Sequence, residues 1–400
     1  GESADAKGNA SGTAGANAVG IAGGSGPGAL VNIGPLNVKA SSTVGAGSIS
    51  VSVGGDVEGS ASASATAGAS GIRGGYKSDE ILNQGTLTVQ ATSIAVAGSI
   101  GVGTDGGDGG QNGSAPEPPS LETSSVKAEA KAVSKAQATG IDGGEGNNRI
   151  TSTAPMTVTS TATTVAGSIG VKVSGLGGGD DGGGTPSGGG QEQPEMPELS
   201  LSSVTTDASA KAEARAAGIR AGGGADTIAN GGDLTVDASS TAVAAGVSVN
   251  VANVDKGLSG SAALAGATAA ALSSAAGIDG GDGNNRISNT ASLGTKASAT
   301  SVGVGVSVDV GISEKGATLG AAIADSSTTA EALASGIRSG AGQDHVTNTG
   351  TIAPEATAGA TAVSVGLTVT NAEKGLAASA ALADADASAK AAARGLETGA

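Results

Sequence analysis

The sequence predicts an all-β protein, a parallel β-solenoid (β-helix) of about six 59-residue coils with about three strand segments in each coil. Three observations lead to this prediction. A glycine recurs at long, regular spacing, apolar residues alternate with polar ones as they do in strands, and polar residues change type from one repeat to the next. The interior must be thin, because 73 of the 400 residues are glycine and the chain has no Cys, Trp or Phe.

The recurring glycine is followed by Ile, or by Leu in the last copy. It marks repeats that begin at Gly20, Gly71, Gly140, Gly218, Gly277, Gly336 and Gly395. The last three spacings are each 59 residues. Repeats that share one period stack on their neighbours rather than folding alone, so we treat residues 1–400 as a single array.

Two spacings are longer than 59 residues, and both contain Gly/Pro-rich insertions, residues 104–120 and 175–199. Proline lacks the N–H group that a strand ladder needs, so we expect these segments to be flexible loops. Uninterrupted repeats have a short turn at the same place, ending at Gly257, Gly316 or Gly375. Both insertions are therefore expected to leave the array at one corner.

Apolar residues in each repeat follow a period of two, but their parity changes along the repeat. Ile228, Leu234 and Val236 lie at even offsets from their marker glycine, whereas Val247 and Val249 lie at odd offsets. An uninterrupted strand would turn one of these sets outward, so the change predicts a bend or bulge between them. A third, Ala-rich segment follows the turn.

Three sets of polar residues recur at fixed offsets. Two residues past the marker the chain has Arg73, Asp142, Arg220, Asp279 and Arg338. Eight residues past it are Asp79, Asn148, Asp226, Asn285 and Asp344. Twelve residues past it are Asn32, Asn83, Ser152, Asn230, Asn289 and Asn348.

In a parallel stack these residues would lie over one another at about 4.8 Å. Alternating charges would then attract, and an asparagine ladder would reinforce the register. The alternative fold is an array of stacked long antiparallel β-hairpins, in which the same residues would pair across hairpins.

Two stretches, GGDGNNRI (Gly280 to Ile287) and GGEGNNRI (Gly143 to Ile150), resemble the nonapeptide GGxGxDxUx of RTX-type toxins and adhesins. The resemblance implies calcium between stacked turns, with Asp79, Asp226, Asp282 and Asp344 as candidate ligands. Asparagine replaces the aspartate of the pattern in both stretches. The alternative is therefore a glycine turn capped by side-chain hydrogen bonds, which fixes the register and binds no cofactor.

Several functional classes are disfavoured. The net charge of −16 opposes binding to nucleic acid or to an anionic membrane, and no apolar run approaches the roughly 20 residues of a membrane helix. His345 is the only histidine, and the equivalent positions of other repeats hold residues such as Glu80 and Arg149. We therefore expect it to be an exposed strand residue rather than a catalytic base. We expect no enzyme. The threonine run Thr161 to Thr164 has no obvious match in adjacent repeats, which disfavours a crystal-binding face.

The array as a whole is similar in repeat style to the repeat regions of large bacterial surface adhesins and filamentous extracellular proteins. This resemblance implies a secreted or cell-surface structural role. The first and last residues, Gly1 and Ala400, leave partial coils, so we expect open strand edges that join copies end to end. The alternative is a calcium-stabilised adhesin or biofilm-matrix segment, with other cell-surface or matrix components as partners.

Overall fold

The computed structural model of the chain describes residues 5–104, 121–175 and 198–399. All regular elements in these ranges are β-strands, so no helix there could cross a membrane. Each long strand pairs in parallel with the equivalent strand of the next repeat, and the short strands do the same. The fold is therefore all-β with parallel strands in a nearly closed sheet, as in a β-solenoid. The alternative with antiparallel pairing between repeats is wrong.

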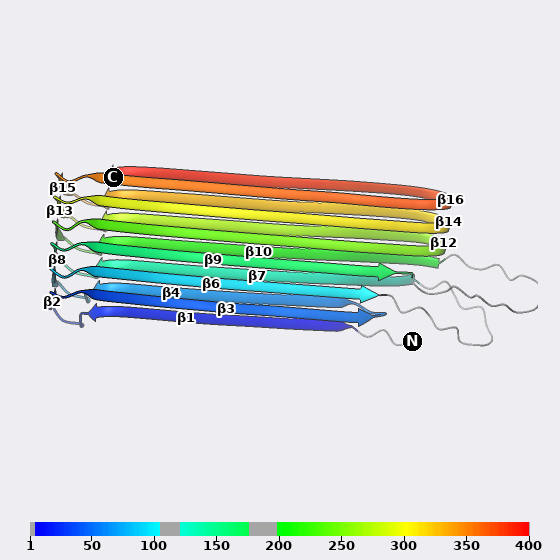
Figure 1. The fold of residues 1–400 in the computed structure, drawn as a ribbon, viewed down its shortest axis with the longest axis horizontal. Coiled ribbons are helices and arrows are strands. Elements are labelled where there is room, and N and C mark those ends of the chain that lie inside the picture. The colour runs from blue at the N-terminus through cyan, green and yellow to red at the C-terminus, as the bar shows by residue number, and fades with distance from the viewer. Residues whose placement is uncertain (1–4, 105–120, 176–197, 400) are drawn as a thin grey trace, which may run out of the picture.

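Short strands form one narrow face. They are β2 (Ala29–Asn32), β5 (Glu80–Asn83), β8 (Arg149–Ser152), β11 (Thr227–Asn230), β13 (Arg286–Asn289) and β15 (His345–Asn348). Figure 1 shows them together at one end of the long strands, and the chain rises through the stack in sequence order from blue to red.

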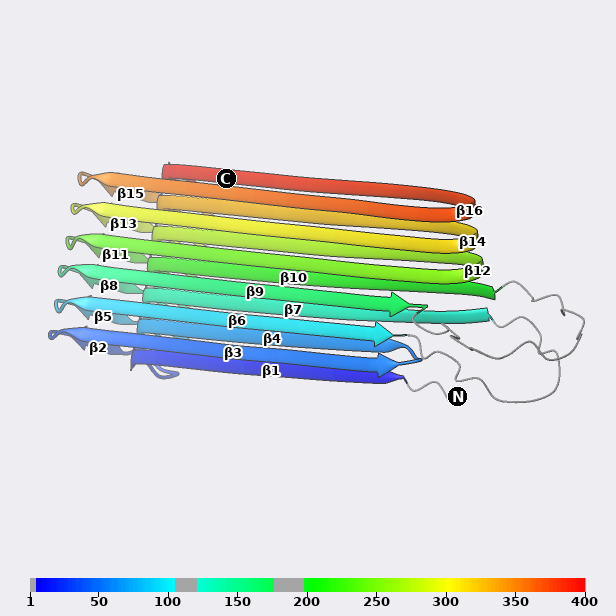
Figure 2. The ribbon, with the colours of Figure 1, turned by 45° about the vertical axis from the view of Figure 1, so that its right-hand side comes forward.

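Long strands form two broad faces. The leading face contains β3 (Leu36–Val53), β6 (Leu87–Thr104), β9 (Met156–Ser174) and residues 234–254, 293–313 and 352–372 of three continuous strands, β12 (Leu234–Asp279), β14 (Leu293–Arg338) and β16 (Ile352–Glu397). The return face contains β1 (Ala6–Ala22), β4 (Val57–Arg73), β7 (Leu121–Asp142), β10 (Glu198–Arg220) and the second halves of β12, β14 and β16. Figure 2 shows the two faces running side by side along the full length of the strands.

The register is displaced by one repeat at every step, whatever the spacing in sequence. Val57 pairs with Val126, Val126 with Val204, and Val204 with Ala263. The insertions at residues 104–120 and 175–199 lie almost wholly outside the described residues. The strands that flank them keep this register, so the extra residues do not shift the stack.

The apolar core is concentrated where the short strands meet the two broad faces. In the inner repeats its fully buried side chains include members of the columns through Ile278, Ile287 and Leu293. The marker glycine lies beside this core, and a Cβ placed on Gly218 would lie 2.5 Å from both Leu234 Cδ2 and the carbonyl oxygen of Gly277. The glycine therefore makes room for the leucine and for the next strand.

The parity of the valines predicted a bend or bulge within the repeat. β12 contains none, so that prediction is wrong. Even-numbered residues face the interior along the whole leading half of this strand, from buried Leu234 to buried Ala252. Val247, Val249 and Val251 consequently point outward. In this half of the leading face the interior positions are mainly Ala, Ser and Gly, with buried valines of the return face opposite some of them, whereas the valines of the leading face point outward.

Hydroxyl-bearing residues do recur in matching columns, contrary to the sequence-based expectation. On the outer side of the leading face Thr163 pairs with Thr241, and Thr241 pairs with Thr300. The match was missed because the step from Thr163 to Thr241 spans 78 residues and includes the second insertion.

Candidate functional site: the polar ladders of the corner

The corner between the return face and the short strands is a glycine turn. Gly281 and Gly283 have φ values of 74° and 124°, which side-chain-bearing residues rarely adopt. The carbonyl oxygens of Gly222 and Gly224 also occupy the positions where Cβ atoms would lie. Glycine is required here both by the backbone angle and by the close approach of the neighbouring repeat.

A hydrogen-bonded ladder follows this turn through all five residues of the Asp/Asn column. The backbone N–H of each residue donates to Oδ1 of the next, from Asp79 to Asn148 (2.9 Å), Asn148 to Asp226 (2.5 Å), Asp226 to Asn285 (3.0 Å) and Asn285 to Asp344 (2.8 Å). Both residue types supply the same acceptor oxygen, so either can occupy the column.

Aspartate and asparagine differ in their second side-chain atom. The Nδ2 group of Asn285 donates to the carbonyl oxygens of Gly283 (3.2 Å) and Ser339 (3.4 Å). The Oδ2 atom of Asp226 has no hydrogen-bond partner, and this side chain is only 1% exposed. Burial raises the pKa of Asp226 to about 6, although hydrogen bonds from Asn148 act in the opposite direction. Oδ2 of Asp344 is also without a partner.

The four candidate calcium ligands do not converge. Asp79, Asp226 and Asp344 are separated by asparagines, so successive carboxylates of the column are two layers, or about 9.6 Å, apart. Asp282 is exposed and pairs in parallel bridges with Gly223 and Ala341 rather than with another acid. No group of three or more His, Asp or Glu side chains gathers within the described residues. Calcium takes six to eight oxygen ligands, and these residues do not fit such a site.

The asparagine column forms side-chain ladders within the stack. Asn32 donates to Oδ1 of Asn83 at 2.7 Å, and Asn83 donates to Oγ of Ser152 at 3.2 Å. Higher in the stack Asn230 donates to Asn289 at 2.8 Å and Asn289 to Asn348 at 2.7 Å. Most of these side chains are buried, so each bond is shielded from water and stabilises one register.

The arginine and aspartate residues also share a column. In stacking order these residues are Arg73, Asp142, Arg220, Asp279 and Arg338, followed by Glu397. Arg338 lies 3.8 Å from Asp279 and 3.4 Å from Glu397, measured between nitrogen and carboxylate oxygen. The Arg338 side chain is 30% exposed, so each ion pair adds modest stability.

A buried polar column inside the leading face was missed by the sequence reading. Lys172, Asn250 and Asp309 stack in adjacent layers and are at most 1% exposed. Lys172 donates from Nζ to Oγ of Ser124, and Ser261 donates to Oδ2 of Asp309 at 2.8 Å. Burial raises the pKa of Asp309, against hydrogen bonds from Ser261 and Asn250. Each of these polar residues lies between two valines in sequence. The sequence-based prediction placed those valines in the interior, which would have turned the polar residues outward.

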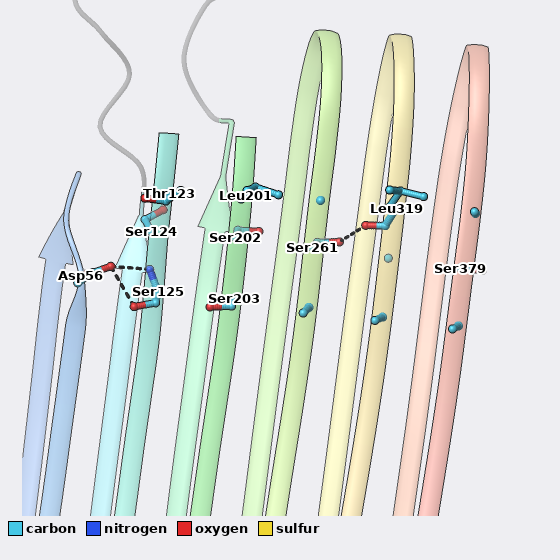
Figure 3. A pocket seen from close by; sticks show the side chains of 16 residues that line it. Asp56, Thr123, Ser124, Ser125, Leu201, Ser202, Ser203, Ser261, Leu319 and Ser379 are labelled. Atoms are coloured by element: carbon cyan, nitrogen blue, oxygen red, sulfur yellow. Dashed lines mark hydrogen bonds between the residues drawn. The ribbon is translucent and has the colours of Figure 1, made fainter. Parts of the chain in front are cut away.

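A shallow groove of about 700 Å³ crosses the return face near the turns of the long strands. Figure 3 shows residues of successive repeats along it, including the register-equivalent Ser125 and Ser203 and, farther along, Leu319, with Asp56 at one end. Asp56 accepts hydrogen bonds from the backbone N–H (2.7 Å) and hydroxyl (3.0 Å) of Ser125. The groove lining consists mainly of small side chains and backbone.

His345 lies on a short strand of the narrow face, where it is exposed and 3.4 Å from the Thr347 hydroxyl.

No known protein family, curated protein or solved structure matches the chain. The arrangement of the ladders and strand edges is therefore the basis for the functional proposal.

Proposed function

We propose that the chain is a non-enzymatic structural protein, a segment or subunit of an extracellular bacterial fibre. In this proposal about six coils form a solenoid that associates with further copies end to end through open strand edges. The observation that carries the proposal is the edge of β16. This 46-residue strand pairs with β14 on one side, and no described strand pairs with its other side. An edge of this length is a template for another strand, whether from a following repeat or from another copy.

The last repeat also has unfilled interactions of the kind that the inner repeats satisfy. Asn289 donates both to Asn348 and to the carbonyl oxygen of Ala291, whereas among the described residues Asn348 donates to Gly350 alone. Ala356 and Ala358 face the interior but are only partly buried. A further layer would bury these alanines, accept the second Asn348 hydrogen bond and pair the β16 backbone.

The extracellular assignment rests on composition. The chain has no cysteine and a net charge of −16, which suits a protein held together by backbone ladders and kept soluble by acidic groups. We place it outside the cell, where its partners would be further copies of itself and, in an adhesin, other surface or matrix components.

The second candidate is a calcium-stabilised RTX-like adhesin or biofilm-matrix segment. It is favoured by the unpartnered Oδ2 atoms of Asp226 and Asp344, which are oxygen atoms without a described donor. The separation of the carboxylates along the column is the argument against it.

Negative-stain electron microscopy and circular dichroism, each with and without EDTA, distinguish the two candidates. A structural fibre gives filaments and a β-sheet spectrum that do not change when calcium is removed. A calcium-dependent segment loses its β-sheet signal in EDTA and recovers it when Ca²⁺ is added. A monodisperse single particle at high concentration, with no filaments, would overturn end-to-end association.

A further inference from the structure

An exposed aliphatic surface covers the outer side of the leading face, near the turns of the long strands. We define it as the five register columns that begin in β3 at Gly45, Gly47, Ile49, Val51 and Val53. Three of these columns contain only Ile, Val and Leu apart from Thr104. Ile49 is 71% exposed in the first repeat and Leu367 is 52% exposed in the last.

The size and chemistry of this surface are those of an interface. Five columns on six paired strands span roughly 950 Å², taking about 6.6 Å between columns and 4.8 Å between strands. Stable interfaces bury about 800 Å² per partner, and the largest apolar patch of a typical monomer is about 300–600 Å². No member of the five columns is charged, although the chain carries a net charge of −16.

Glycines within the aliphatic surface have no role in packing the monomer. A Cβ added to Gly45, Gly98 or Gly167 would meet nothing within 4 Å. Glycine weakens a strand interior, and it is often found where another backbone or ligand approaches closely. These open glycines therefore indicate a partner that contacts the outer side of the sheet.

The glycines lie opposite larger residues when the surface is turned onto itself. A two-fold axis parallel to the strands keeps each column in place and reverses the stacking order, so that β3 faces β16, β6 faces β14 and β9 faces β12. The Gly47 column contains Gly47, Gly98, Gly167, Ala245, Val304 and Val363 in stacking order. Gly47 then faces Val363, and Gly98 faces Val304. Small residues meet large ones at each end of the column.

One neighbouring column shows the same contrast at its end under this rotation. In the column on one side, Gly45 in β3 faces Thr361 in β16. Farther along the leading face Lys39 in β3 faces Glu355 in β16, which places opposite charges together twice in each pair of chains. The surface is therefore complementary to a second copy in both shape and charge.

We propose that two copies of this chain pair face to face through the aliphatic surface, with strands parallel and stacking orders reversed. The strands of the leading face run straight and side by side (Figures 1 and 2), so the columns of two copies align over their whole length. Such pairing joins solenoids laterally. It is independent of the end-to-end association proposed above, since it uses side chains of a face rather than backbone edges.

Cross-linking tests the orientation of the two copies. The chain has no cysteine, so only the introduced thiols react. In the proposed pair Ile100 of one copy faces Val306 of the other. Three samples are treated with a short bismaleimide: the Ile100→Cys chain alone, the Val306→Cys chain alone, and a mixture of the two. We expect covalent dimers in the mixture at several times the yield of either variant alone. Equal or higher yield from Val306→Cys alone would overturn the reversed arrangement.

Filling the open space at Gly98 tests the pairing itself. Gly98→Val adds a side chain that meets open space in the monomer but clashes with Val304 of the second copy, twice in each dimer. We expect the dimer to weaken about 100-fold or more in sedimentation equilibrium, with an unchanged circular dichroism spectrum. Gly98→Val combined with Val304→Gly exchanges the two partners and restores the dimer.

The matched control is Gly15→Val, because Gly15 is also open but lies on the return face. It should leave the dimer unchanged. Equal dimerisation of all three variants, or a monomeric parent chain that still forms filaments through its edges, would refute face-to-face pairing. Loss of filaments with retention of dimers would instead refute the end-to-end proposal.

Discussion

Replacing the buried aspartate of the corner, Asp226→Asn, should stabilise the protein at neutral pH. The asparagine keeps the Oδ1 atom that accepts the Asn148 N–H, and its Nδ2 group replaces an Oδ2 atom that has no partner. Asn148 and Asn285 show that the site can satisfy such an amide, since both donate to turn carbonyls within their own repeats.

The size of the effect follows from the pKa of Asp226, which burial raises from 3.8 to about 6. A difference of this size corresponds to about 3 kcal/mol, since each pKa unit is about 1.4 kcal/mol. The folded-state pKa lies above the unfolded one, so folding favours the protonated acid. The side chain carries no penalty below about pH 4, and the penalty grows as pH rises to about 6. The substitution should therefore raise the free energy of unfolding by about 3 kcal/mol at pH 8 and leave it unchanged at pH 3.5.

Guanidinium unfolding of the parent and the Asp226→Asn chain at both pH values, in EDTA and in Ca²⁺, measures the difference. The control is Asp282→Asn, a change in the same turn at an exposed position, which should have no effect at either pH. Lower stability of Asp226→Asn in Ca²⁺ would show that the carboxylate binds the ion. Equal stabilisation at both pH values would refute the explanation by burial.

Three further predictions follow from packing, each measured as a change in the free energy of unfolding. Gly281→Ala should destabilise by about 2 kcal/mol or more, because its φ is 74° and a carbonyl occupies the Cβ position, whereas Gly167→Ala, with open space around it, should be neutral or stabilising by about 0.5 kcal/mol. Asn289→Ala breaks two links of the asparagine ladder and should cost about 2–4 kcal/mol. In the unpaired chain Ile278→Ala should cost about 2–5 kcal/mol and Val249→Ala less than about 1 kcal/mol, and the reverse order would show that the valines face inward.

The sequence predicted the parallel stack because register leaves a direct trace in residue types. A column such as Asp79, Asn148 and Asp226 is held together by hydrogen bonds between successive repeats, so its members are limited to residues with an acceptor oxygen. The corner turn was equally visible, since from the third repeat marker to the sixth two positive φ angles in each turn, as at Gly281 and Gly283, require glycine. The short strands and their core isoleucines follow the same repeat.

The interior was harder to predict, because hydrophobic periodicity assumes that the larger apolar residues are buried. In β12 the interior positions of the leading half include Ser248 and Asn250, and the valines alternate with them on the outside. The broad sheets pack closely here through Ala, Gly and Ser, and the valines that do lie between them, Val57, Val126 and Val204, come from the return face. Periodicity gave the strand correctly but assigned its two sides the wrong way round.

The outward valines and the open glycines have a common explanation in assembly. A solenoid that functioned as an isolated particle would gain nothing from aliphatic columns facing water, and it would gain strand stability from a side chain at Gly98 or Gly167. Both features are accounted for when the outer side of the leading face is the core of an interface. There the valines are buried, and Gly47 and Gly98 receive Val363 and Val304 of a second copy. The alternation of outward valines, which led to the wrong prediction of the interior, is thus the pattern of a sheet with two buried sides. One side is covered by its own return strands and the other by a partner.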